Sequence, residues 1–540
     1  MDHFIRKNMS CALTFASAHF FHMTRIILAL LILCPLLASA GFTPAENSKL
    51  NYRIVGFSAP CKGRCALQIA SGRCNNIDSF KNNIIITRMF TDGRVIAEVP
   101  GFGADYSWRI LEEDNSKTQI HHFSTLPCPN ADTSKAQFRI ITNTGQCNNY
   151  YVFVDVTGTL YDMQGQPVWF LPPHLQKPFV KSGNRDFKAT TYSTISFLNE
   201  DEATEIDYNG NVRFSVRGTG VISGDTTELL HHEFTRLANG HYMVLGSERV
   251  KWSLPYFHPD SVQTHDPSFV QGKDDTTRQK LEFGTIIEYD ETGKMVWSWR
   301  SSGYFKNSDL FTHFRPNGMF RFVDVHENAF FFDEKKKVVY IGFRDISRIV
   351  KIKYPEGTIL AGYGAKSDNT DDVLCNDFFC GQHRIAVNND GDLCVYNNNA
   401  TANGADPEVV VLRETAGKAG GLEKVWEFDC PVDGMNESEV NADRISKEQT
   451  AMLNKVNPGA AKVTRMTSGG NVVPLDGGSY FVSTSRQFAR SFIVNKNKEI
   501  LWSAVPEIRI YSGGPWTAIA TYRESIITDK ELESLIWNAQ

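Results

Sequence analysis

The sequence lacks the features that would place it on a nucleic acid or across a membrane. It has no long run of Lys or Arg, and its 56 basic residues face 61 acidic ones, for a formal net charge of −5. A nucleic-acid partner is therefore not expected, because phosphate backbones select clustered basic surfaces. The apolar run at residues 26–37 is shorter than the roughly 20 residues that cross a bilayer. We therefore expect no stable membrane insertion.

A nucleotide-binding loop is also missing. The glycine-rich stretch 417–421 has neither the Lys-Ser or Lys-Thr ending nor the strand-to-helix setting of a phosphate loop. A turn between strands is the simpler interpretation, and no cofactor is expected.

The N-terminus has the pattern of an export signal. Arg25 precedes the apolar run, which ends in Ala38-Ser39-Ala40, the small-x-small form that a signal peptidase needs. We expect translation from Met23, with the residues before it an upstream extension, and cleavage after Ala40. Residues 1–40 are thus predicted to be a signal peptide.

Nine cysteines follow this cleavage site, and exported cysteines usually pair. Cys375 and Cys380 are placed to close a small loop just before His383. An odd total leaves one thiol over. A metal site is the weaker alternative for the first three of the nine, which are Cys61, Cys65, Cys74, Cys128, Cys147, Cys375, Cys380, Cys394 and Cys430.

Two elements recur along the chain. One is a histidine followed by a turn and a short apolar strand, at His232, His326 and His383. The other is a hairpin with an Asp, Asn or Gly turn and an aromatic end. Its copies are residues 160–169, 206–214, 287–297 and 493–502, with less regular versions at 348–354 and 422–426.

This repetition predicts an all-β fold, a six-bladed β-propeller. The six hairpins lie at spacings of roughly 45 to 80 residues, whereas blades typically take about 40–50, so insertions are expected. Four to eight blades close around a central channel. We assign residues 156–540 to the propeller and residues 41–155, which are cysteine-rich, to a small N-terminal β-sandwich domain. A series of β-sandwiches is the alternative, but it does not explain the histidines. A short amphipathic helix is expected at residues 529–539.

The aligned repeats add further polar residues to the histidines. Asn328 lies two positions after His326, on the same face of an extended strand, and Arg344 ends the following strand. The last blade has Gly in place of His, and its strand ends in Thr484, with Ser485 as the alternative. This set contains imidazoles, a guanidinium, an amide and a hydroxyl, and it has few carboxylates. Such a pocket suits the binding of a tetrahedral oxyanion, because its groups can donate hydrogen bonds to the oxygens.

Other uses of three histidines remain open. Zinc or copper is the competing ligand, although Arg344 and the lack of a carboxylate ligand argue against it. A propeller that binds a ligand or metal without catalysis is a second alternative, because fold alone does not give function. His258 and His265 are expected in a loop.

Several motifs together resemble those of the bacterial aryl-sulfate sulfotransferases. They are the blade start His326-Glu327-Asn328 with Arg344 after it, the pair Gln382-His383, and the final strand that ends at Thr484. The resemblance covers about residues 155–505. It implies an exported, PAPS-independent enzyme with a six-bladed propeller behind an N-terminal β-domain. The expected location is the periplasm, with secretion as the alternative, and a homodimer is possible.

The resemblance also implies a ping-pong transfer between small phenyl sulfates and phenols. His383 would attack sulfur and form a sulfohistidine, while Arg344, Asn328 and Thr484 bind the sulfuryl oxygens. An aryl-sulfate hydrolase, with water as acceptor, is a further alternative. No metal is required.

His326 and His232 are then the candidates to protonate the departing phenolate and to deprotonate the acceptor. The sequence does not divide these roles between them. His231 is an alternative to His232 because the two are adjacent.

Overall fold

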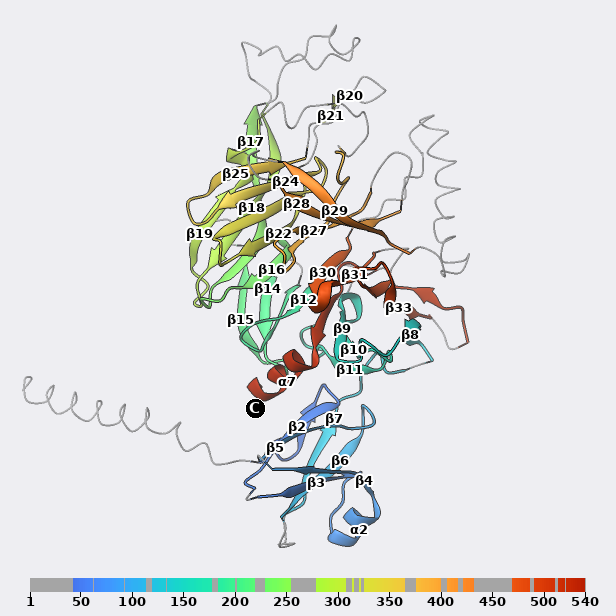
Figure 1. Ribbon diagram of the computed structural model, residues 1–540. Helices are drawn as coiled ribbons and strands as arrows, with labels where there is room; N and C mark the ends of the chain where they lie inside the picture. The colour runs from blue at the N-terminus through green and yellow to red at the C-terminus, as the bar shows by residue number, and fades with distance from the viewer. Residues whose placement is uncertain are drawn as a thin grey trace, which may run out of the picture. The chain divides into compact units, whose positions relative to one another are not determined.

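The computed structural model describes the chain in two compact units (Figure 1). One, the N-terminal unit, comprises residues 42–49, 55–97 and 105–124, and the other, the propeller unit, comprises residues 50–54, 98–104 and 125 onward. The structure describes residues 42–539 except 62, 92, 113–118, 133, 177–182, 200–201, 219–228, 254–277, 307–312, 315–319, 322–324, 365–374, 400–405, 416–420, 432–468, 486–489, 510–512 and 520. The predicted signal peptide, His258, His265 and most of the 417–421 stretch lie outside the described residues.

The N-terminal unit is a small β-sandwich, as predicted. The aromatic rings of Phe57 and Trp108, whose centroids are 5.2 Å apart, join its two sheets. A six-residue helix, α2 (Ile77–Asn82), begins where the Asn76 side chain accepts a hydrogen bond from the Ser79 amide. The larger sheet has the order β1 (Ser48–Leu50), β7 (His121–Thr125), β6 (Asp105–Glu112), β3 (Cys65–Ser71) and β4 (Ile84–Phe90), and the smaller pairs β2 (Ile54–Ser58) with β5 (Arg94–Glu98).

The described part of the propeller unit contains a two-stranded sheet, β20 (His313–Phe314) with β21 (Phe320–Arg321), and six larger antiparallel sheets, which we number as blades one to six. From the inner strand outward, blade one consists of β35 (Ser525–Thr528), β9 (Tyr150–Val154), β10 (Thr159–Asp162) and β11 (Pro167–Phe170), and blade two of β12 (Asn184–Ala189), β13 (Ile195–Asn199), β14 (Glu202–Ile206) and β15 (Val212–Arg217). Blade three consists of β16 (Leu230–Arg236), β17 (Tyr242–Ser253), β18 (Arg278–Tyr289) and β19 (Met295–Arg300), and blade four of β22 (Glu327–Asp333), β23 (Val338–Phe343), β24 (Arg348–Lys353) and β25 (Thr358–Tyr363). Blade five consists of β26 (Arg384–Val387), β27 (Leu393–Asn397), β28 (Glu408–Glu414) and β29 (Leu422–Asp429), and blade six of β30 (Asn471–Leu475), β31 (Ser479–Ser483), β32 (Ser491–Val494) and β33 (Ile500–Ile508).

The six inner strands close a ring. Each of β35, β12, β16, β22 and β26 contacts the next, and β30 contacts β35 again. The six-bladed propeller predicted from the sequence is therefore confirmed. Closure removes the free inner edges that an open row of sheets would expose.

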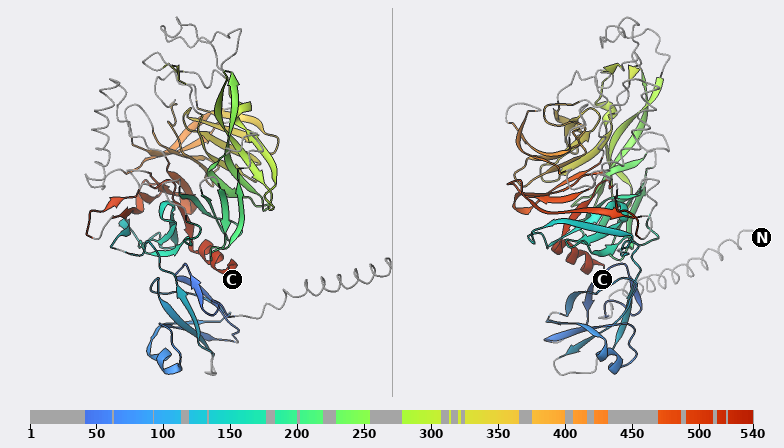
Figure 2. Two further views of the ribbon diagram at one scale, coloured as in Figure 1. Left: turned by 180° about the vertical axis from the view of Figure 1, so that it is seen from behind. Right: turned by 90° about the vertical axis from the view of Figure 1, so that its right-hand side faces the viewer.

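The first blade is completed by the last strand of the chain. The closing strand β35 pairs with β9, in the register Ser525 opposite Phe153, and α7 (Asp529–Asn538) follows it (Figures 1 and 2). This helix starts with a reciprocal capping box between Thr528 and Glu531, and it confirms the predicted C-terminal helix.

Two strands of the predicted N-terminal domain, residues 41–155, lie in the propeller instead. The strand β8 (Ala136–Asn143), which is an alternating run, pairs with β33 in blade six, and β9 (Tyr150–Val154) belongs to blade one. Blade six also gains β34 (Thr517–Ala518). The pattern predicted a strand correctly, but alternation alone does not say which sheet a strand joins.

The aromatic ends of the hairpins join neighbouring blades. In four blades, a Trp on the outer strand donates its indole N–H to a backbone carbonyl in or near a hairpin turn of the next blade, at 2.7 to 3.0 Å. Each contact satisfies a polar group while the ring covers apolar surface. The pairs are Trp169 with Tyr208, Trp297 with Pro355, Trp426 with Lys496, and Trp502 with Met163.

The described residues contain two disulfides, Cys61–Cys65 and Cys375–Cys380. The second is the predicted loop closure before His383. The expectation of a single leftover thiol is wrong, because five cysteines are free and buried. They pack as small apolar side chains, and burial raises the pKa of the Cys128 thiol to about 11. The five are Cys74, Cys128, Cys147, Cys394 and Cys430.

Among the described residues, no helix is both long enough and apolar enough to cross a bilayer.

Candidate functional site

The three recurring histidines begin the inner strands of blades three, four and five. His232 lies in β16, and His326 and His383 directly precede β22 and β26. The ring centroid of His232 is 5.5 Å from that of His326 and 5.8 Å from that of His383. The repeat thus brings three imidazoles together at the centre of the ring. Among the described residues, no group of three His, Cys, Asp or Glu side chains has the arrangement of a metal site.

The backbone is strained at this position of the inner strands. His232 has a φ of +61° and His326 a φ of +46°, and Asp186 occupies the same place in β12 with a φ of +59°. In β16 the pairing register shifts between His231 and Phe234. A left-handed residue costs about 1–2 kcal/mol, and such strain typically persists where a side chain must be aimed at a site.

The hydrogen bonds of His383 fix its tautomer. Nδ1 lies 3.0 Å from the Gly470 carbonyl, which can only accept, so Nδ1 carries the proton. Nε2 then accepts from the Tyr522 hydroxyl at 2.8 Å. Burial, followed by the nearby Arg523 charge, holds the pKa of His383 well below its usual range. The neutral ring therefore directs the lone pair of Nε2 toward Tyr522.

Blade six has Gly470 where blades three, four and five carry a histidine, and the space around it explains this. Gly470 has a φ of +91°, and a Cβ there would lie 2.1 Å from the Tyr396 ring. A side chain at this position would therefore displace the ring, and the bare carbonyl remains available to orient His383.

His232 is buried among basic groups. Burial, then the neighbouring His231 and His326, hold its pKa well below the ordinary value, with Arg185 contributing as well. The ring is therefore neutral at pH 7. A neutral buried imidazole can act as a general base, because it has a free lone pair and no charge to neutralise first.

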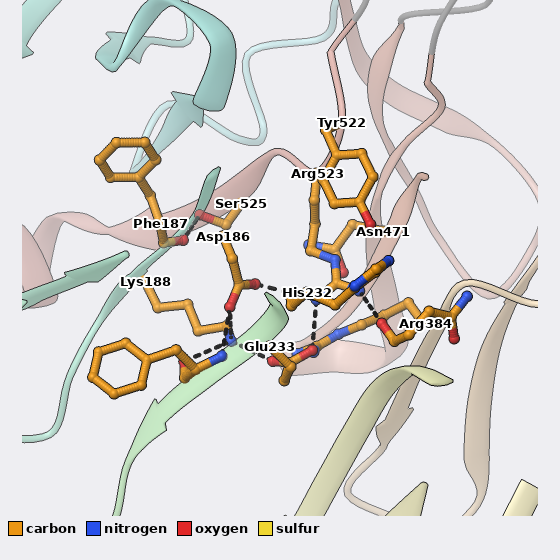
Figure 3. Close-up of polar contacts among 12 residues, drawn as sticks. Asp186, Phe187, Lys188, His232, Glu233, Arg384, Asn471, Tyr522, Arg523 and Ser525 are labelled. Atoms are coloured by element: carbon orange, nitrogen blue, oxygen red, sulfur yellow. Dashed lines mark hydrogen bonds and ion pairs between the residues drawn. The ribbon is translucent and has the colours of Figure 1, made fainter. Parts of the chain in front are cut away.

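Arg523 lies two residues before the closing strand and connects four other blades. Its side chain is 1% exposed, and Figure 3 shows it pointing toward Asp186, His232 and Glu233. Its guanidinium donates to the carbonyl oxygens of His232 (2.7 Å), Asn328 (2.9 Å) and His383 (3.1 Å) and to the carboxylates of Glu233 (2.6 Å) and Asp186 (3.3 Å). It thus fixes the backbone that carries two of the histidines.

Glu233 balances the charge of this cluster. Burial would raise its pKa, but Arg384, Lys188 and Arg523 outweigh burial and hold the pKa of the carboxyl well below the usual range. Lys188 donates to both Glu233 and Asp186. The carboxylate is therefore ionised and fixed by cations from blades one, two and five.

The predicted oxyanion ligands take different positions. Arg344 bonds to Asp345 and lies close enough to His383 to help lower its pKa. Asn328 donates from Nδ2 to the Gln382 carbonyl at 2.8 Å, across the seam between blades four and five. Thr484 is buried, and its hydroxyl accepts from the Arg490 amide at 3.0 Å. The structure therefore brings Arg344 to the histidines, while the Asn328 and Thr484 side chains make structural bonds.

Arg185 is a second guanidinium at the site, which the sequence reasoning missed. Its charge centre lies 5.3 Å from the centroid of the Tyr522 ring. In the part of the chain that the structure describes, the Nε atoms of Arg185 and Arg344 are buried and have no hydrogen-bond partner. Two guanidiniums with unused donors favour an anionic ligand. Blade two carries Asp186 rather than His at the repeat position, so the repeat gave no signal there.

Tyr522 and Arg523 were missed for another reason. They belong to the segment before β35, which contains no copy of the repeated hairpin or of the histidine element. An available signal was the strand-like run 525–528 at the end of the chain, because a propeller needs a final strand to close its ring.

The family model described as Arylsulfotransferase (ASST) matches residues 129–416. This region includes all three central histidines and ends before Thr484 and the closing strand. No match was found among curated proteins.

Solved structures match at low similarity. The Cps50 (Swd1) β-propeller domain of Myceliophteria thermophila is 9% identical, with a TM-score of 0.34, and the match covers 74% of this chain and 91% of that one. A putative 6-phosphogluconolactonase from Bacteroides uniformis is 11% identical, with a TM-score of 0.30, covering 73% and 100%. The Dos1 propeller is 7% identical, with a TM-score of 0.29, covering 88% and 96%.

Proposed function

Because the chain belongs to the arylsulfotransferase family, we propose that it is a PAPS-independent aryl-sulfate sulfotransferase that works through a sulfohistidine on His383. The observation that carries this proposal is the Nδ1 contact between His383 and the Gly470 carbonyl. It leaves Nε2 as the nucleophile of a neutral, buried imidazole.

In the first half-reaction the Nε2 lone pair of His383 attacks the sulfur of a phenyl sulfate. The N–S bond forms as the S–O bond breaks, and the electron pair of that bond leaves on the phenolate oxygen. The Tyr522 hydroxyl, 2.8 Å from Nε2, gives up its hydrogen bond as the sulfuryl group approaches. A second phenol then takes the group, and the covalent step divides one difficult transfer into two easier ones.

Arg344 and Arg185 are the groups we assign to the sulfuryl oxygens. Both have a buried Nε without a partner among the described residues, and a planar guanidinium matches the oxygens of a sulfuryl group. We also assign Asn328 and Thr484 to the sulfuryl oxygens, which requires each side chain to exchange its hydrogen bond within the protein for one to the substrate. Charge stabilisation of this kind accounts for much of the rate in transfers with loose transition states.

Intact-protein mass spectrometry tests the proposal. The protein is exposed briefly to 4-nitrophenyl sulfate without an acceptor. We expect wild type to gain the mass of one SO3 group, about 80 Da, as a covalent nucleophile requires, and His383→Ala to gain none. His174→Ala, in an exposed turn, is the matched control and should gain the same mass as wild type.

Two other outcomes would point to the alternatives. Release of 4-nitrophenol without any mass gain on wild type, at a rate unaffected by added phenols, would favour a hydrolase. Neither phenol release nor mass gain, with retained folding, would favour a ligand-binding propeller.

We also propose that the protein is exported to the periplasm with the signal peptide removed, and that it forms a homodimer. The two disulfides support an oxidising compartment. N-terminal sequencing of periplasmic protein should begin after Ala40, and a monomer in light scattering would contradict the dimer.

A further inference from the structure

A row of three side chains crosses the seam between blades three and four beside the catalytic centre. Nε2 of His231 lies 3.2 Å from a Glu327 carboxylate oxygen. Nδ1 of the same ring lies 2.7 Å from Nδ1 of His232. The order is therefore Glu327, His231, His232, and the His232 ring in turn lies beside the rings of His326 and His383.

The hydrogen-bond roles along this row follow from its chemistry. An ionised carboxylate can only accept a hydrogen bond, so the 3.2 Å contact favours the tautomer of His231 whose proton is on Nε2, facing Glu327. Nδ1 of a neutral His231 is then without a proton and must accept. The proton between the two rings therefore belongs to Nδ1 of His232, and Nε2 of His232 carries a lone pair.

Glycine makes room for the carboxylate. A Cβ at Gly284, in β18, would lie 1.9 to 2.3 Å from three atoms of the Glu327 side chain. Gly284 has an ordinary φ, so its own backbone does not require glycine. The Glu327 side chain is 5% exposed, which is uncommon for glutamate unless it has a partner. Blade three is thus shaped to admit a carboxylate from blade four.

We propose that Glu327 and His231 form a relay that fixes the tautomer of His232, so that Nε2 of His232 is the general base for the acceptor phenol. The inference rests on the proposed function and deepens it, since it divides the roles that the sequence left open between His232 and His326. Glu327 and His231 are positioning residues because they act through His232.

The protons balance over one cycle. In the second half-reaction the phenol oxygen forms its bond to sulfur, the N–S bond to His383 breaks, and the phenolic proton moves to Nε2 of His232. In the next first half-reaction the leaving phenolate takes that proton back. The enzyme returns to its starting state with no net proton gained or lost.

The surroundings of His232 show why a carboxylate matters. His231, His326, His383 and Arg185 all disfavour its protonated form, as does burial. Tyr522 is neutral, with its ring centroid 5.8 Å from that of His232. Glu327 is joined to His232 through the His231 ring, so in the proposed relay its negative charge offsets part of this cost.

The decisive experiment uses enzyme already sulfurylated on His383 by 4-nitrophenyl sulfate, whose leaving group needs no proton. Loaded wild type and Glu327→Gln are mixed with either phenol or an acidic phenol that is ionised at the assay pH. General base catalysis typically contributes about 10²–10⁴-fold. We expect Glu327→Gln to slow transfer to phenol by about 10-fold to 100-fold, and to leave transfer to the ionised acceptor and loading of His383 nearly unchanged.

Two further variants distinguish the loss of the relay from an unspecific loss of active-site structure. Glu288→Gln removes a carboxylate from another imidazole, His241, in the same blade. It lies about 13 Å along β18 from Gly284, at roughly 3.3 Å per residue, and should change neither acceptor rate. Gly284→Ala, which displaces Glu327 without altering any ionisable group, should reproduce Glu327→Gln. Equal slowing of both acceptors by Glu327→Gln would overturn the relay.

The tautomer gives a readout that does not depend on activity. In ¹⁵N histidine spectra of wild type, we expect the His232 proton on Nδ1, and loss of this preference in Glu327→Gln. A proton on Nε2 of His232 in wild type would overturn the relay even if His383 is sulfurylated. Conversely, an unsulfurylated His383 would contradict the proposed function while the spectra still report on the relay.

Discussion

At the scale of single residues, the site depends on groups that are held from several directions at once. His383 is oriented by Gly470 on one side and meets Tyr522 on the other. Arg523 holds the carbonyl of the same histidine. A displacement of about 1 Å in such a group can cost 10²-fold in rate, so residues that never touch a substrate can control the reaction.

Arg523→Lys tests this arrangement. Lysine keeps the charge but has no planar fork, so it cannot bond to three carbonyls and two carboxylates together. We expect a loss of about 3–5 kcal/mol in the free energy of unfolding, as for a broken buried ion pair. We also expect sulfurylation of His383 to slow by more than tenfold. Denaturant unfolding and timed mass spectrometry measure the two effects.

Arg213→Lys is the matched control. This arginine also bonds to a buried carboxylate, Asp207, but its side chain is 51% exposed, and exposed pairs contribute about 0–1 kcal/mol. Similar losses in both variants would contradict a special role for Arg523.

At the scale of elements, the segment that leads into the closing strand contains an unusual buried carboxyl. Burial, then the nearby Asp155 charge, raise the pKa of Glu524 well above its usual value. The Ser491 hydroxyl donates to one of its oxygens. The folded state therefore binds a proton here that the unfolded chain, with an ordinary glutamate, gives up at lower pH.

This linkage predicts a dependence of stability on pH. With a raised folded pKa, the stabilisation is complete below the unfolded pKa and is lost as pH rises toward the folded pKa, by up to about 1.4 kcal/mol per pH unit. Glu524→Gln removes the titration and keeps the shape. We expect the melting temperature of the variant to exceed that of wild type increasingly from pH 5 to pH 8. A difference that stays constant over this range would contradict the shift.

At the scale of the whole molecule, the described chain has two disulfides and five buried thiols. Burial raises the pKa of Cys147 and Cys394 as well as that of Cys128, and a protonated thiol is a poor nucleophile. The five thiols are therefore expected to be inert in the native state.

Alkylation followed by mass spectrometry checks that the two disulfides are formed and that the five thiols are inert in the native state. The protein without residues 1–40 should take up no label when native and five labels in denaturant without reductant. With reductant, the two disulfides should add four more. Labelling of the native protein would show that the cores around these cysteines open.

The sequence by itself determined what is local and repeated. Hairpin turns, alternating strands and the spacing of His232, His326 and His383 are encoded in short stretches, so the six blades and the grouped imidazoles could be predicted. The Cys375–Cys380 loop was predictable for the same reason, because its two ends are five residues apart.

Only the tertiary structure decided what depends on closing the ring. Closure brings Tyr522 and Arg523 from the end of the chain against His383, places β8 in blade six, and sets Glu327 of one blade beside His231 of another. None of these contacts leaves a pattern in a short window of sequence. They arise because six separate sheets share one centre, where side chains from distant segments must satisfy one another's charges and hydrogen bonds.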